Sequence, residues 1–88
     1  MPTQDEAGNL GKTLGSARHK ALIEFIVERR KALQMSQAEL AEKLGQYQSF
    51  VARLESGQRR IDVVEFLDIS EILQFDPSRT IKLLTRKA

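Results

Sequence analysis

Residues 37–56 read QAELAEKLGQYQSFVARLES, and this stretch decides the fold. Apolar side chains recur at helical spacing on both sides of Gly45, which indicates two short helices joined by a tight turn. Helices joined in this way cross steeply, so only a small side chain such as Ala41 fits at the crossing point. The stretch therefore predicts a helix-turn-helix. The side chains expected to fill its corner are Leu40, Leu44, Val51 and Leu54.

Start and stop signals set the limits of these two helices. Ser36 and Glu39 have the spacing of a capping box, which predicts that the first helix begins at Gln37. Gly45 can adopt the left-handed conformation that ends a helix, because it has no Cβ. The second helix is expected from about residue 47 to 56, before Gly57.

The same signals predict three further helices outside this stretch. Ser16 can cap a helix with apolar residues at helical spacing, Asp62 with Glu65 starts another, and Asp76 before Pro77 starts a third. No segment alternates between apolar and polar residues as a strand would. We therefore expect an all-α domain of five helices. The side chains predicted to be buried are Leu40, Ala41, Leu44, Val51, Leu54 and Leu67.

Length and composition exclude several classes of protein. A chain of 88 residues fits one domain with a small core, because a chain of this size buries roughly 60–70% of its unfolded surface. The sequence has no cysteine and one histidine, so we expect no disulfide, no metal site and no cofactor. The polar N-terminus is unlike a signal peptide, and no apolar run is long enough to span a membrane. A cytoplasmic protein is expected.

Charge is unevenly distributed, although 14 basic and 12 acidic residues give a net charge of only +2. Residues 62–76 contain five acidic side chains and no basic one, whereas residues 77–88 contain four basic side chains and no acidic one. Such separation would let one face of the molecule meet polyanionic phosphate. Residues 1–15 contain three glycines among polar residues and are expected to be a flexible arm, which leaves residues 16–88 as the folded domain.

The central stretch and its flanks resemble the Cro/phage-repressor-like helix-turn-helix family, also called the XRE family. The resemblance rests on the Ser36-Gln37 opening, Ala41, Gly45 and the Leu54-Glu55-Ser56-Gly57 ending. It implies a five-helix lambda-repressor-like DNA-binding domain with its helix-turn-helix at residues 37–56. It also implies a transcriptional regulator, expected to be a repressor, that binds a double-stranded DNA operator as a homodimer.

The resemblance assigns roles to individual residues. The second helix of the motif would enter the major groove, where its exposed side chains would read bases; these are Tyr47, Gln48, Ser49 and Arg53. Phosphate contacts would fall on Gln37, Ser56, Arg59 and Arg60. Arg30 and Glu55 would form an ion pair between the first helix of the domain and the end of the reading helix.

Two other functions stay open at this point. An antitoxin subunit would also bind operator DNA, but its main partner would be a toxin protein. A helical interaction module would have kept the fold and lost DNA binding, and the polar residues at positions 47–49 argue against it. No nucleophile with a base at a recognisable spacing and no glycine-rich phosphate loop is present, so an enzyme is not expected.

Overall fold

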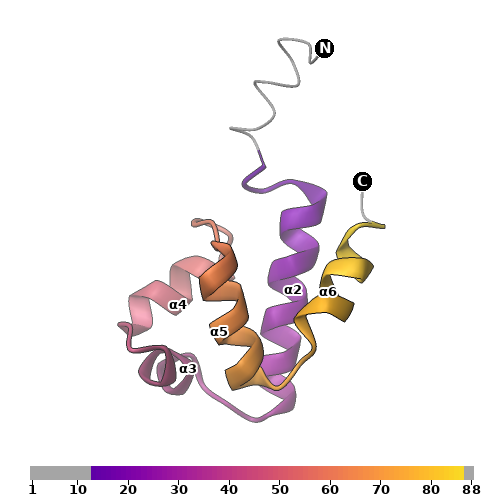
Figure 1. The fold of residues 1–88 in the computed structure, drawn as a ribbon. Helices are drawn as coiled ribbons and strands as arrows, with labels where there is room; N and C mark the ends of the chain where they lie inside the picture. The colour runs from indigo at the N-terminus through magenta and orange to yellow at the C-terminus, as the bar shows by residue number, and fades with distance from the viewer. Residues whose placement is uncertain (1–12, 87–88) are drawn as a thin grey trace.

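The computed structural model describes residues 13–86, which form five α-helices, labelled as in Figure 1. The helices are α2 (Ala17–Ala32), α3 (Gln37–Leu44), α4 (Gln48–Glu55), α5 (Val63–Leu73) and α6 (Pro77–Leu84). Within these residues there is no strand, and the predicted all-α class is confirmed. The short helix α4 packs against α2, α3 packs against α4 and α5, and α6 lies beside α2 on the other side (Figure 1).

Side-chain caps explain where the helices begin. In α3, the hydroxyl of Ser36 accepts the backbone N–H of Glu39 at 3.0 Å, and the Ser36 N–H donates to the Glu39 carboxylate at 3.2 Å. Asp62 and Glu65 form the same reciprocal pair at the start of α5. These bonds satisfy N–H groups that have no partner within the helix. The helix starts predicted at these caps are confirmed.

Two different arrangements end α3 and α5. Gly45 ends α3 with φ 69°, and the N–H of Gln46 donates to the carbonyl of Ala41 at 2.9 Å. Gln74 ends α5 in the same left-handed region, with φ 60°, although it carries a side chain. Arg29 of α2 donates to the carbonyls of Leu73 and Gln74 at 2.9 and 3.1 Å. This arginine therefore satisfies the end of α5 and fixes it to α2.

The core lies where α2, α3, α4 and α5 meet. Ala41 is 2% exposed, so this small residue lies in the packed core between α3 and α4. The buried apolar side chains among the described residues are Ile23, Ile26, Leu40, Ala41, Val51, Leu54, Phe66, Ile69 and Leu73. Four of the six side chains predicted to be buried are therefore buried, and they include both members on α4.

The prediction was wrong for Leu67, and Leu44 is only half-buried. Leu67 is 43% exposed because the inward stripe of α5 consists of Phe66, Ile69 and Leu73. These residues have the i, i+3, i+7 spacing of one helix face, and Leu67 lies about 100° further round. Leu44 is the last residue of α3, at the edge of the core.

Three phenylalanines connect α2, α5 and the segment before α6. The Phe75 ring meets Phe25 edge-on at a centroid distance of 4.9 Å, and Phe66 lies 5.7 Å from Phe75. Such ring pairs add to the free energy of burial. The half-buried ring of Phe75 thus joins α2 to α5 within one copy of the chain.

Residues 1–12 of the predicted arm lie outside the described residues. Residues 13–15 form a turn in which the N–H of Ser16 donates to Thr13 at 3.1 Å and the N–H of Gly15 donates to Nδ1 of His19 at 2.9 Å. None of the helices within residues 13–86 has the length and hydrophobicity that crossing a membrane requires.

Candidate nucleic-acid interface

The outer face of α4 carries the four side chains predicted to read bases. Tyr47 is the N-cap residue and is 84% exposed, and Gln48, Ser49 and Arg53 are also exposed. Val51 and Leu54 on the opposite face are buried. The structure thus brings all four predicted side chains onto one solvent-facing surface of a helix whose other face is fixed in the core.

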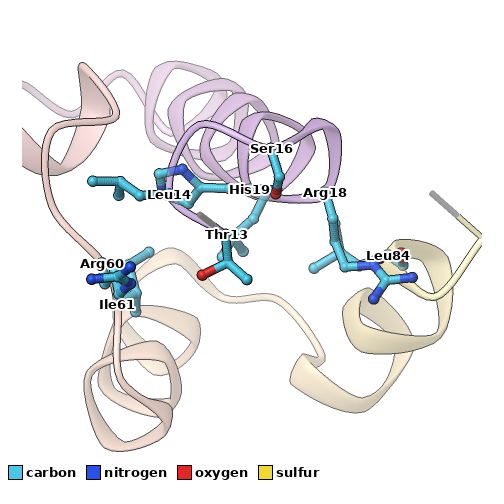
Figure 2. A pocket seen from close by; sticks show the side chains of 9 residues that line it. Thr13, Leu14, Ser16, Arg18, His19, Arg60, Ile61 and Leu84 are labelled. Carbon is cyan, nitrogen blue, oxygen red and sulfur yellow. Dashed lines mark hydrogen bonds between the residues drawn. The ribbon is translucent and has the colours of Figure 1, made fainter. Parts of the chain in front are cut away.

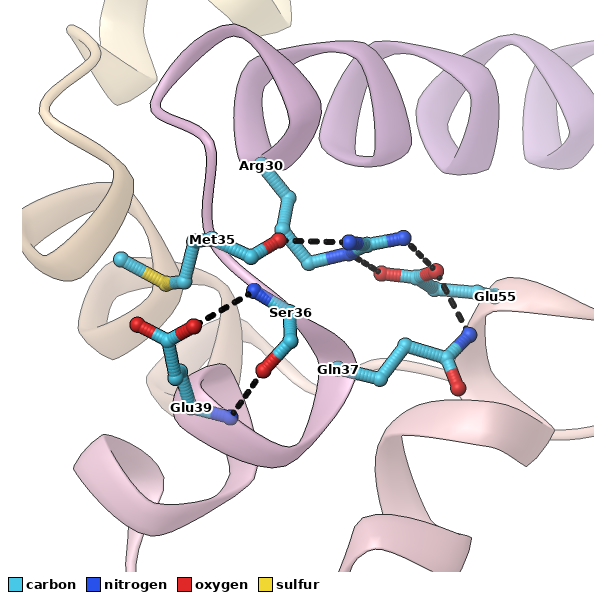
Figure 3. Close-up of polar contacts among 6 residues, drawn as sticks. All are labelled: Arg30, Met35, Ser36, Gln37, Glu39 and Glu55. Atoms are coloured by element: carbon cyan, nitrogen blue, oxygen red, sulfur yellow. Dashed lines mark hydrogen bonds and ion pairs between the residues drawn. The ribbon is translucent and has the colours of Figure 1, made fainter.

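A buried ion pair holds the C-terminal end of α4. Arg30 and Glu55 bond twice, from Nε to Oε2 at 2.6 Å and from Nη2 to Oε1 at 2.9 Å (Figure 3). Their side chains are only 10% and 6% exposed. Nη1 of Arg30 also donates to the carbonyl of Met35 at 2.7 Å. Because these bonds join α2, the α2–α3 connection and α4, they fix the orientation of α4 relative to the domain.

Gln37, predicted to contact phosphate, also belongs to this network. Its amide nitrogen donates to Oε1 of Glu55 at 2.9 Å (Figure 3), and its side chain is half-buried. An amide nitrogen has two N–H groups. The bond to Glu55 therefore orients the amide at the start of α3 and leaves its nitrogen a second N–H.

Arg59, also predicted to contact phosphate, packs against α4 and α5. Its guanidinium lies over the ring of Phe50, and it donates to both oxygens of Glu65 at 3.2 to 3.3 Å. Sequence reasoning missed this cluster, because Phe50 and Glu65 are separated by the α4–α5 loop. The Asp62–Glu65 spacing revealed the helix cap but gave no indication of the contact with Arg59.

The remaining predicted phosphate residues lie after α4. Ser56 is the C-cap residue of α4, is exposed and donates to the carbonyl of Arg53 at 3.2 Å. Arg60 is exposed in the α4–α5 loop. Gln37 bonds to Glu55, the last residue of α4, and Ser56, Arg59 and Arg60 follow that residue in the sequence.

Comparison with known families and structures decides the family. A helix-turn-helix family model matches residues 26–79, more than half of the chain. The chain belongs to the XRE-family helix-turn-helix proteins. A solved structure of an XRE-family like protein from Pseudomonas syringae pv. tomato str. DC3000 is similar, with 40% sequence identity and a TM-score of 0.76. The similarity covers 89% of this chain and 95% of that chain. A comparison with curated protein sequences gave no match.

XRE-family membership supports a DNA-binding regulator, and proteins of this family are generally not enzymes. The matched residues include the whole helix-turn-helix and the α4–α5 loop. No group of three or more His, Cys, Asp or Glu side chains in residues 13–86 could hold a metal ion. The exposed polar face of α4 is therefore the candidate site of this XRE-family protein.

Proposed function

We propose that this XRE-family protein represses transcription by inserting α4 into the major groove of a specific operator. The observation that carries the proposal is the outer face of α4, which presents exposed polar side chains to solvent. The inner face of this helix is buried in the core, and the Arg30–Glu55 ion pair fixes its C-terminal end. Gln48 can bond to adenine through two hydrogen bonds, and Arg53 can do the same to guanine. Tyr47 and Ser49 complete the proposed reading surface.

The proposed phosphate contacts come from the start of α3 and from the residues that follow α4. Gln37 begins α3, where outward N–H groups and the helix dipole favour an anion. Its amide is oriented by Glu55, so it needs no further ordering to donate its second N–H to a phosphate. Ser56, Arg59 and Arg60 would contact the backbone beyond the end of α4, and Arg59 would do so while it remains bonded to Glu65.

A homodimer is the proposed binding unit, because one such module offers a small contact area and two-fold proteins read pseudo-palindromic operators. The exposed apolar side chains of α6 are candidates for the interface. Ile81 is 50% exposed and Leu83 is 47% exposed.

The test begins with a selection from randomised DNA duplexes to find the preferred operator. Binding of Gln48→Ala and Arg53→Ala to that operator and to random DNA is then compared with the wild type. Each substitution should weaken the free energy of binding to the operator by about 1–3 kcal/mol, because a base contact is lost. It should also relax base preference at one or two base pairs. Random DNA should be affected less.

Arg79→Ala on α6 is the charge-matched control for Arg53→Ala, since both side chains are exposed arginines and Arg79 lies outside the proposed reading surface. It should leave base preference unchanged. A selection that enriches no sequence, together with unchanged DNA binding by Gln48→Ala and Arg53→Ala, would remove the proposal. A helical interaction module would then be the better description.

A further inference from the structure

Two neighbouring helices, α5 and α6, expose large apolar side chains to solvent. Apart from Tyr47 at the start of α4, every exposed large apolar side chain in residues 13–86 belongs to one of these two helices. On α5 they are Val63, Val64 and Leu67, and on α6 they are Ile81 and Leu83. When exposed apolar surface is concentrated on one part of a small domain, it indicates a surface that another molecule covers.

The exposed face of α5 is apolar at its start and acidic towards its end. Val63, Leu67 and Glu71 follow one another at intervals of four residues, so they lie on one face of the helix. Asp68 is also exposed and lies four residues after Val64. The helix contains three acidic residues and no basic one. Its exposed apolar surface is therefore bordered by negative charge.

The exposed face of α6 carries the opposite charge. Ile81 and Leu83 lie on either side of Lys82, and all three side chains are exposed. Arg79 is exposed four residues before Leu83, on the same face of the helix. The helix contains two basic residues and no acidic one. Its exposed apolar surface is therefore bordered by positive charge.

We propose that α6 of one copy of the chain packs on α5 of a second copy, which returns the same contact. The exposed apolar side chains of the two helices would then be buried against each other, and this burial is favourable. The acidic border of α5 would meet the basic border of α6, and such complementary charge selects the partner and its orientation. Because residues 74–76 alone join α5 to α6 (Figure 1), the two helices lie close together, and two reciprocal contacts can close a two-fold dimer.

Charge argues against the two alternatives in which a helix meets its own counterpart. A contact between two copies of α6 would bring Arg79 and Lys82 towards the same basic side chains. A contact between two copies of α5 would bring Asp68 and Glu71 towards the same acidic side chains. Like charges that face each other weaken an interface. The pairing of α5 with α6 avoids both conflicts.

The inference rests on the homodimer of the proposed function and names the surface that joins its two copies. The interface and DNA reading can fail separately, because self-association is measured without DNA. A monomer that reads an operator through α4 would refute the interface alone. A dimer of the expected kind that enriches no operator would refute DNA reading alone.

The test reverses one charge on each helix of the full chain. Sedimentation velocity should show a dimer of the wild type. Glu71→Lys and Lys82→Glu should each raise its dissociation constant by about tenfold or more, because a reciprocal interface contains the reversed charge twice. An equimolar mixture of the two variants should recover the dimer. In that mixed dimer one contact keeps the natural pair of charges and the other has the pair reversed, so both are attractive.

Glu28→Lys and Lys31→Glu are the matched controls, because both side chains are exposed on α2. They should leave the dissociation constant unchanged, alone and when mixed. Circular dichroism should show the same helix content in all four variants. A monomeric wild type, a dimer that Glu71→Lys leaves intact, or a mixture that stays monomeric although both variants are helical would overturn the proposal.

The groove shown in Figure 2 lies between the start of α2, the α4–α5 loop and the end of α6, and the proposed interface makes no use of it.

Discussion

The guanidinium carbon of Arg59 lies 4.2 Å from the centroid of the Phe50 ring, within the range of a cation–π interaction. The same guanidinium is bonded to Glu65, so one side chain of the α4–α5 loop connects α4 to α5. Its side chain is 30% exposed. Arg59 therefore fixes the middle of the α4–α5 loop, which follows the proposed reading helix.

A double-mutant cycle between Phe50→Leu and Arg59→Gln should show a coupling energy of about 0.5–1 kcal/mol, because each substitution removes the same cation–π contact. The free energy of unfolding is measured by urea denaturation for both single variants and the double variant. Phe50→Leu combined with Arg79→Gln is the control and should be additive. Additivity in the Arg59 cycle would mean that the contact contributes nothing.

Ala41→Leu should lower the free energy of unfolding by about 1–3 kcal/mol, because the crossing of α3 and α4 has no space for three more carbon atoms. Ala38→Leu is the matched control on the same helix, since Ala38 is exposed. It should change stability by less than about 0.5 kcal/mol. Urea denaturation checks both, and equal effects would contradict the geometry of the corner.

Glu55→Gln should destabilise the fold by about 3 kcal/mol or more, because it leaves the Arg30 guanidinium buried without a compensating charge. Glu65→Gln makes the same chemical change in the more exposed pair with Arg59, and glutamine can still serve the capping box. Glu65→Gln should lower the free energy of unfolding by about 1 kcal/mol or less. Thermal unfolding of the two variants compares them directly, and equal costs would mean that burial of the first pair is unimportant.

Arg60→Ala should weaken binding to operator and to random DNA alike. It should reduce the slope of log affinity against log salt concentration by about one, since one fewer counterion is released. Fluorescence anisotropy at several salt concentrations measures both quantities. A loss confined to the operator would instead identify Arg60 as a base-reading residue.

Footprinting on the selected operator should reveal two related half-sites with centres ~34 Å apart, one turn of duplex, as expected for a two-fold dimer. Ile81→Asp should abolish the paired footprint at protein concentrations that saturate the wild type, because a charge would replace an exposed apolar side chain of the proposed interface. A single asymmetric half-site in the wild type would count against the dimer.

The helix boundaries were predictable because their causes are local. The reciprocal caps at Ser36 and Asp62 and the turn at Gly45 depend on residues within one turn of each other, and the structure confirms them. Burial on α5 was less predictable. Its sequence, VVEFLDISEIL, has apolar residues on several faces, so the pattern alone does not select the inward stripe. Packing against α2 and α3 turns Phe66 inward and leaves Leu67 exposed.

The candidate site, too, could be predicted from the sequence only in part. Exposure of Gln48 and Arg53 follows from the buried positions of Val51 and Leu54, since helix periodicity relates the two faces. The Arg30–Glu55 pair was expected only from the family resemblance, and the structure contains it. Contacts between Arg59, Phe50 and Glu65 depend on tertiary packing. No spacing in the sequence indicates them.

Helix α6 buries one residue, Thr80, among those described, whereas Ile81 and Leu83 stay half exposed. A helix with so little buried surface opens locally at a smaller free energy than the core requires. Backbone amides of α6 should therefore exchange their hydrogens when this helix alone detaches. The amides of Ile26 and Leu54 should exchange only when the whole domain unfolds. A partner that bound α6 would slow this exchange, and the effect would grow with the fraction of the protein that is bound.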